Sequence, residues 1–202
     1  LETRTGNPKA GRAHWRALFL EHPASPAARG LEDDQLPAAL LSDEERVRRA
    51  EKLLTSSRYR RARAELEALT PPGPTTLREK WVDLLVQARV RTGDVDEAVE
   101  TARGYVRAAP ESVAHAQSLA WALGKASKPA EAGAAYGDAF KLAKKYPRRA
   151  ATLGKDVAAE LCFYSGFLRF EADAFDEARK VLAACEPEVQ GTVFDAFGLW
   201  YR

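Results

Sequence analysis

The sequence predicts an all-α protein that forms a right-handed solenoid of antiparallel helix pairs, and three observations support this prediction. Alanine is the commonest residue, with 38 copies, and isoleucine is absent, so helix-favouring residues dominate. A short pattern ending in alanine occurs four times. Capping residues and prolines stand where helices should begin and end. A β-sandwich, a β-barrel and a doubly wound α/β fold are excluded, because a large sheet needs more β-branched residues than this chain has.

The helices expected in chain order cover residues 8–21, 26–40 with a break near Pro37, 42–56, 58–69, 77–92, 95–108, 112–126, 129–145, 155–173, 175–185 and 191–202. Ser42 followed by Glu45 has the form of a capping box. The segment 70–74 contains three prolines and must be a connector. Residues 157–170 are apolar on nearly every side, as in a helix packed between neighbours. We expect an extended loop over residues 145–155.

The repeated pattern places Ala62, Ala98, Ala132 and Ala178 at spacings of 36, 34 and 46 residues. Each follows a residue that can start a helix and two mostly charged residues. Twelve residues earlier stands a second set of mostly small residues: Ala50, Val86, Ala120 and Gly166. Two antiparallel helices pack closely only where facing side chains are small, so one such contact is expected in each hairpin. A period near 34 is that of the tetratricopeptide repeat, and we describe the units as tetratricopeptide-like.

The composition sets further limits on size and class. Two hundred and two residues, 46% of them apolar and 30% charged, suit a folded chain. We expect one solenoid domain over residues 1–202. The net charge of +2 favours no class of partner, residues 1–11 contain no signal-peptide core, and no apolar run reaches the roughly 20 residues of a membrane span.

Several short motifs resemble the N-terminal superhelical region of soluble lytic transglycosylases. The segment 21–26 (EHPASP) is similar to a junction between its helix pairs. The segments 49–54 (RAEKLL) and 58–62 (RYRRA) are similar to its opening repeat. Similarity to a later repeat and to the aromatic segment after it lies in 163–167 (FYSGF), 170–172 (FEA), 175–178 (FDEA) and 199–202 (LWYR).

This resemblance implies a bacterial periplasmic protein that cleaves the glycan strands of peptidoglycan. In that family a lysozyme-like domain, C-terminal to the superhelix, holds a catalytic Glu-Ser pair. Glu111 and Ser112 form such a pair here, but the chain has no methionine and lacks the companion motifs, so we interpret them as a helix start. We expect no catalytic residues in this chain and a catalytic domain after Arg202. The chain would be a non-catalytic scaffold that positions peptidoglycan or partners; the alternative is a standalone tetratricopeptide-like adaptor that binds a peptide or protein.

A basic strip over residues 46–63 has a net charge of +7 in a nearly neutral chain. One interpretation is a strip that contacts anions: stem-peptide carboxylates, an acidic partner segment or phosphates. The other is a solvated face balanced by nearby acids. Nucleic acid is disfavoured because only Tyr59 interleaves the cations. The residues assigned to ligand binding are Arg46, Arg49, Lys52, Arg58, Arg60 and Arg61, and the balancing acids are Asp33, Asp34, Asp43, Glu44 and Glu45.

No cofactor or metal site is expected. The histidines, His14, His22 and His115, are scattered, whereas a metal site needs clustered ligands. No glycine-rich phosphate loop occurs. The aromatic residues at helical spacing are interpreted as inter-helix core: Trp81, Trp121, Phe163, Phe167 and Phe170.

The two cysteines, Cys162 and Cys185, fall at equal distances from a turn between Asp173 and Ala174. Both therefore lie at the same level of the last hairpin, on faces that should meet. Two interpretations stay open. They are buried thiols that pack as small apolar groups, or they form a disulfide, which a periplasmic location permits.

Overall fold

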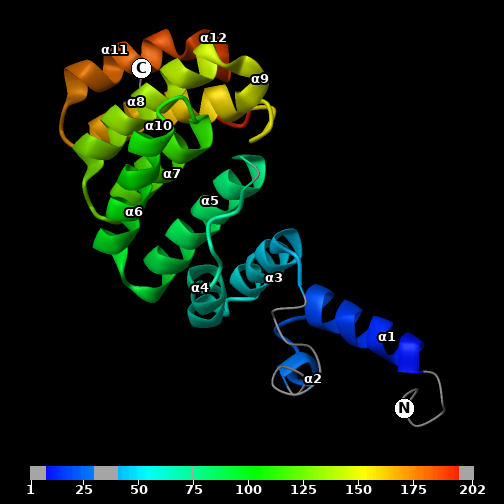
Figure 1. The fold of residues 1–202 in the computed structure, drawn as a ribbon. Helices are drawn as coiled ribbons and strands as arrows, with labels where there is room; N and C mark the ends of the chain where they lie inside the picture. The colour runs from blue at the N-terminus through cyan, green and yellow to red at the C-terminus, as the bar shows by residue number, and fades with distance from the viewer. Residues whose placement is uncertain (1–7, 30–40, 74, 196–202) are drawn as a thin grey trace. The chain divides into compact units, whose positions relative to one another are not determined.

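The computed structural model describes residues 8–29, 41–73 and 75–195, and every regular element in those ranges is a helix (Figure 1). The all-α prediction is therefore confirmed. The chain divides into two compact units, Leu1–Thr92 and Gly93–Arg202. That both units belong to one right-handed solenoid stays a prediction.

The first unit is organised around α3. This helix packs against α1, α4 and α5, and α4 also packs against α5. The helices of this unit are α1 (Pro8–Glu21), α2 (Pro26–Arg29), α3 (Asp43–Thr55), α4 (Tyr59–Glu67) and α5 (Thr75–Thr92).

The second unit is organised around α8 and α10. Helix α8 packs against α7 and α10, and α10 also packs against α11 and α12, so the helices follow one another in space as in sequence (Figure 1). The helices of this unit are α6 (Val95–Ala108), α7 (Val113–Lys125), α8 (Pro129–Lys145), α9 (Pro147–Ala150), α10 (Val157–Glu171), α11 (Phe175–Ala184) and α12 (Glu186–Val189).

Most predicted helix boundaries agree with the structure to within two residues. The expected loop over 145–155 is wrong in part, because α9 forms there with Pro147 in its first turn, a position that proline favours. The expected helix over 191–202 is also wrong in part, because residues 191–194 form turns; residues 196–202 lie outside the described part. Of the helix expected over 26–40, residues 30–40 and its break at Pro37 lie outside the description as well.

The capping box at the start of α3 is confirmed. The Ser42 hydroxyl accepts a hydrogen bond from the backbone N–H of Glu45 at 3.3 Å, and the Glu45 carboxylate accepts one from the N–H of Ser42 at 3.0 Å. Within the connector, residues 70–73 are not helical. Both ends of the α3–α4 hairpin are thus set by local sequence.

A common backbone turn precedes four of the helices. The residue two positions before α4, α6, α8 and α11 has a positive φ: 59° at Ser57, 96° at Gly93, 56° at Ser127 and 61° at Asp173. Only one of the four is glycine, which adopts this left-handed conformation without steric cost. The repeat is therefore more regular in the backbone than in the sequence.

The recurrent alanines occupy the core, as the repeat predicts. Ala62, Ala98 and Ala132 are fully buried and Ala178 is 1% exposed. Gly166, the expected neighbour of Ala178, is also buried. A Cβ on Gly166 would lie 2.5 Å from Cγ of Leu182. Leu182, one turn after Ala178, is the side chain that requires a glycine at this position.

The aromatic residues follow the core prediction with one exception. Trp81 and Phe163 are buried, and Trp121 and Phe167 are half-buried. Phe170 is 38% exposed and makes an edge-to-face contact with Phe175, which is more exposed still. Its placement in the core is therefore wrong, because it lies at the end of α10, where the chain turns into α11.

Cys162 and Cys185 are joined by a disulfide, with their Cα atoms 5.7 Å apart. The bond links α10 to the residue that caps α11, and both residues belong to an apolar cluster with Phe163 and Leu182. The structure therefore agrees with the second interpretation of this pair, a disulfide.

In the described part of the chain, no helix is both long and apolar enough to cross a bilayer.

Candidate anion-binding site

The basic strip lies on α3, on α4 and in the turn between them, and its cations divide into two groups. Those on α3 are held by contacts within the protein. Arg46 donates a hydrogen bond to the carbonyl of Ala68 at 3.3 Å. Lys52 and Arg48 both form ion pairs with Glu21 of α1, and these hydrogen bonds lower the pKa of the Glu21 carboxyl, that from Lys52 most.

Arg49 lies inside the first unit rather than on its surface. It is 3% exposed, its guanidinium lies 3.6 Å from the centre of the Phe19 ring, and it pairs with Glu65 at 2.6 Å. Burial lowers the pKa of Arg49 and raises the pKa of Glu65, although each charge opposes the effect on the other. Arg49, assigned to ligand binding from the sequence, therefore joins α3 to α1 and α4.

The acids that balance the strip differ from those expected. The pairing carboxylates belong to Glu21, Glu65 and Glu67, whereas Glu45 pairs with Arg16 of α1. Asp33 and Asp34 lie outside the described residues. The sequence interpretation used neighbours in the chain, but helix packing brings acids from α1 and α4 instead.

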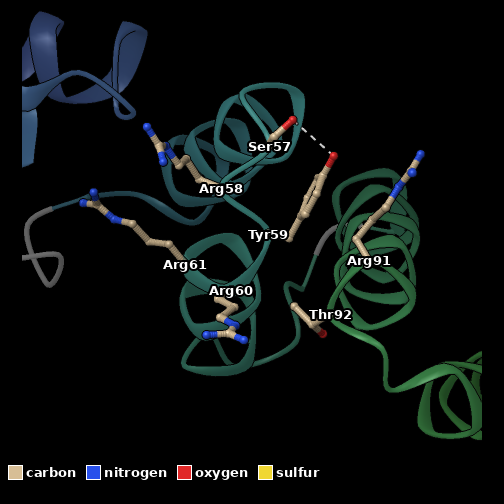
Figure 2. Close-up of a pocket in the computed structure, with 7 residues that line it drawn as sticks. All are labelled: Ser57, Arg58, Tyr59, Arg60, Arg61, Arg91 and Thr92. Atoms are coloured by element: carbon tan, nitrogen blue, oxygen red, sulfur yellow. Dashed lines mark hydrogen bonds between the residues drawn. The ribbon is translucent and has the colours of Figure 1, made fainter.

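The cations at the start of α4 line a pocket of about 420 Å³. Arg58 is the N-cap residue of α4, and Arg60 and Arg61 lie in its first turn. The end of α5 completes the wall, because α4 and α5 pack together. The lining consists of Ser57, Arg58, Tyr59, Arg60, Arg61, Arg91 and Thr92 (Figure 2).

Tyr59 is fixed at one side of this pocket. Its hydroxyl donates a hydrogen bond to Oγ of Ser57 at 3.2 Å, and the guanidinium of Arg91 lies 5.8 Å from the centre of its ring, within range of a cation–π contact. Thr92 is held as well, because its Oγ1 accepts a hydrogen bond from Arg63 at 3.2 Å and donates to the carbonyl of Ala88.

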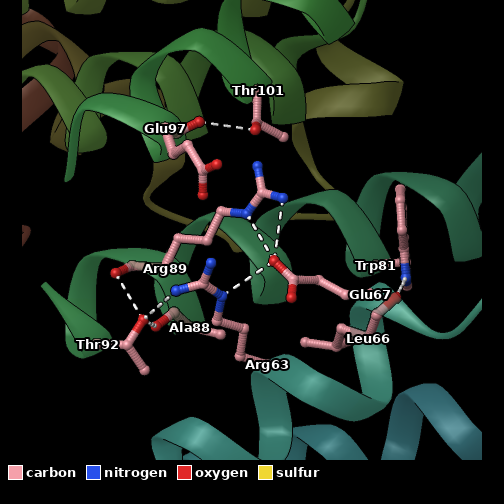
Figure 3. A network of polar contacts seen from close by, with 9 residues as sticks. All are labelled: Arg63, Leu66, Glu67, Trp81, Ala88, Arg89, Thr92, Glu97 and Thr101. Atoms are coloured by element: carbon pink, nitrogen blue, oxygen red, sulfur yellow. Dashed lines mark hydrogen bonds and ion pairs between the residues drawn. The ribbon is translucent and has the colours of Figure 1, made fainter. Parts of the chain in front are cut away.

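A charged network that includes Arg63, the hydrogen-bond donor to Thr92, joins α4 to α5 (Figure 3). The Glu67 carboxylate pairs with Arg63 at 2.9 Å and with Arg89 at 3.0 Å. Partial burial would raise the pKa of Glu67, but the hydrogen bonds from these two arginines outweigh it and lower that pKa. The network holds the end of α5 against α4.

Three arginines of the pocket have no carboxylate partner in the described part of the chain. Arg58, Arg60 and Arg91 are exposed and form no ion pair there, whereas Arg61 pairs with Glu65 at 3.5 Å. The guanidinium groups spread around the rim rather than converge on one point (Figure 2). The first N–H groups of a helix also lack intrahelical partners and favour anions. This arrangement suits several negative charges along an extended ligand.

Of the six residues assigned to binding, Arg58, Arg60 and Arg61 line one pocket, whereas Arg46, Arg49 and Lys52 do not. Arg49 shares the Glu65 carboxylate with Arg61, but from inside the first unit. Sequence reasoning missed Arg91 and Thr92. The repeat contained a usable signal, because antiparallel packing places the end of α5 beside the start of α4. The basic strip covers consecutive residues only, so it does not include Arg91, which lies about thirty positions further along the chain.

The Glu111–Ser112 pair starts a helix in the second unit. Ser112 is the N-cap of α7 and accepts a hydrogen bond from the N–H of His115 at 3.2 Å, while Glu111 is exposed and lies 3.7 Å from Arg149. Among the described residues, no group of three or more His, Cys, Asp or Glu side chains could hold a metal ion.

Comparison with known proteins adds no family assignment, because no family model, no curated protein and no solved structure gives a significant match to the sequence.

Proposed function

We propose that this chain is a non-catalytic helical scaffold that binds an extended anionic polymer through the pocket at the start of α4. We further propose that it is the superhelical region of a periplasmic protein that resembles soluble lytic transglycosylases. Its two units would then form one right-handed solenoid, and it would position peptidoglycan for a catalytic domain.

The observation that carries this proposal is the trio of Arg58, Arg60 and Arg91. All three are exposed and form no ion pair in the described part of the chain, although acids elsewhere in the first unit are paired with other cations. A surface that balances its own charge would have acids here too. Arginine forks bind carboxylates and phosphates in bidentate geometry.

The ligand proposed is the peptide-bearing wall polymer rather than nucleic acid. Peptidoglycan stem peptides carry repeated carboxylates, which suits cations spread around a rim. Proteins that bind single-stranded nucleic acid usually add aromatic side chains for successive bases, and this pocket has only Tyr59. The motif resemblance to lytic transglycosylases supports the same class of ligand, and the disulfide suits an oxidising compartment.

Sedimentation with purified sacculi tests the proposal. The variant Arg58→Glu/Arg60→Glu/Arg91→Glu should lose most of the binding of the parent chain. The matched control is Arg107→Glu/Arg148→Glu/Lys180→Glu, which changes three exposed cations of the second unit and alters the net charge equally. Equal loss in both variants would show that only net charge matters, and unchanged binding in the first would overturn the proposal.

A standalone adaptor that binds a peptide or protein is the second candidate. It is favoured by a hollow of about 400 Å³ in the second unit, between α6, α7 and α8. Its lining is mostly apolar and comprises Val106, Pro110, Ala116, Leu119, Ala135, Asp138, Lys141, Leu142 and Lys145. A parent chain that does not bind sacculi at all would favour the adaptor.

A further inference from the structure

We infer that the arginine pocket and a second pocket beside it form one groove, and that this groove binds a short peptide carrying both a free carboxylate and a side-chain ammonium group. The inference rests on the proposed function, because it names the part of the polymer that the site recognises. It goes further by assigning a role to acidic and apolar residues of α3 and α5.

The two pockets share a wall. The second pocket has a volume of about 400 Å³ and lies between α3 and α5. Tyr59 and Arg91 line both pockets. The ring of Tyr59 is held by Ser57, so the boundary between the two pockets is a fixed aromatic face. A ligand longer than one residue can therefore extend from one pocket into the other.

The first pocket is strongly positive, whereas the second also contains acids and is neutral overall. The first is lined by four arginines and no acid. The second is lined by Glu51, Asp83, Lys80 and the shared Arg91, so its two acids balance its two cations. A ligand with a negative and a positive group is consequently favoured in one orientation, with its carboxylate at the arginines.

The carboxylates of the second pocket can accept a hydrogen bond from an ammonium group in addition to the contacts they already make. Glu51 pairs with Lys80 at 2.6 Å, but both side chains are more than one-third exposed, and exposed pairs contribute little. Asp83 accepts a hydrogen bond from the amide of Gln87 at 2.8 Å, and a carboxylate can accept further bonds.

The floor of the second pocket suits an aliphatic chain. Leu54 and Leu84 line it and are nearly buried. The methylene groups of a lysine-like side chain can cover such a surface while its ammonium group stays near water. The pocket therefore favours a diamino acid over a compact cation, with the ammonium group directed towards Glu51 and Asp83.

Calorimetry with three short peptides and the full chain tests this inference. The probes are acetyl-lysyl-alanine, its C-terminal amide and acetyl-norleucyl-alanine, and inorganic phosphate serves as an anion without a side chain. Removal of the carboxylate should weaken binding by about tenfold or more. Replacement of lysine by norleucine should weaken it by about fivefold.

The variant Glu51→Gln/Asp83→Asn should bind the lysyl and norleucyl peptides equally. Its matched control, Glu97→Gln/Glu171→Gln, changes two exposed acids of the second unit and should retain the preference for lysine. Circular dichroism checks that α3 and α5 stay folded, and Glu51→Gln alone should reduce the preference in part if the double variant is unstable.

The inference is overturned if no peptide binds, if phosphate binds as tightly as the lysyl peptide, or if the norleucyl peptide binds as well as the lysyl peptide in the parent. In those cases the sedimentation assay still reports separately on the proposed function. Loss of sacculus binding in the arginine variant, combined with no preference between peptides, would leave the anion site in place and remove the second pocket from it.

Discussion

Both units of this protein have a buried apolar core, but they differ in the interactions added to it. The first places a charged pair, Arg49 and Glu65, between its helices and joins α1, α3, α4 and α5 through further ion pairs. The second has a core of alanines and aromatic rings around α8 and α10, closed by a disulfide. Cations that serve structure and cations that stay available for a ligand thus occur side by side in the first unit.

The largest effect is expected at the buried pair. Arg49→Met should lower the free energy of unfolding by about 3 kcal/mol, because it removes the nearer partner of the largely buried Glu65 carboxylate and leaves only Arg61, at 3.5 Å. Arg48→Met, at the neighbouring exposed position, should cost less than about 1 kcal/mol. The double variant Arg49→Met/Glu65→Leu should recover most of the loss. Urea unfolding, monitored by hydrogen exchange, measures these free energies. Equal losses of stability in the variants at positions 48 and 49 would contradict the buried role of Arg49.

The next effect concerns the second unit alone. Cys162→Ala/Cys185→Ala should lower stability by about 2–4 kcal/mol, because the bond restricts the unfolded chain. Hydrogen exchange should rise in α10 and α11 and stay unchanged in α3 and α4. In denatured, unreduced protein from an oxidising compartment, alkylation should find no thiols. Two alkylated cysteines would show that the bond does not form.

A smaller effect tests how tightly the last hairpin packs. Gly166→Ala should destabilise the second unit by about 1–3 kcal/mol, because the new Cβ would lie 2.5 Å from Leu182. Gly104→Ala is the matched control in α6, where nothing lies within 4 Å of the new atom; it should be neutral or stabilising by up to about 1 kcal/mol. Thermal unfolding of both variants measures these effects. An unchanged melting temperature in Gly166→Ala would show that the two helices can move apart to accept the methyl group.

The smallest effect is a pH dependence in the second unit. Burial raises the pKa of Glu160, and the hydrogen bond from Gln117 only partly offsets this. A raised native pKa means that protonation favours folding, so this contribution is present at low pH and is lost as the pH rises through the native pKa. Glu160→Gln, which stays neutral, should therefore raise the melting temperature at pH 7 but not at pH 3. An equal change at both pH values would contradict this account.

Local sequence patterns predicted the helices well and the site only in part. The capping box at Ser42, the connector at 70–73 and the buried alanines follow from neighbouring residues or from the repeat, and all were predicted. The partners of Arg49 could not be predicted, because Phe19 and Glu65 reach it only through helix packing. Arg91 reaches the pocket through the same packing of α4 against α5. The close approach of Leu182 to Gly166 depends on how the two helices are rotated about their axes.

The salt dependence of sacculus binding tests the central claim most directly. Exposed cations lose reach as the Debye length falls from about 10 Å at 0.1 M salt to about 3 Å at 1 M. Binding of the parent chain should therefore weaken steeply as salt rises, and the variant Arg58→Gln/Arg60→Gln/Arg91→Gln should bind weakly at low salt with a much shallower dependence. The control Arg107→Gln/Arg148→Gln/Lys180→Gln should match the parent. Identical salt curves for the parent and the pocket variant would contradict the account.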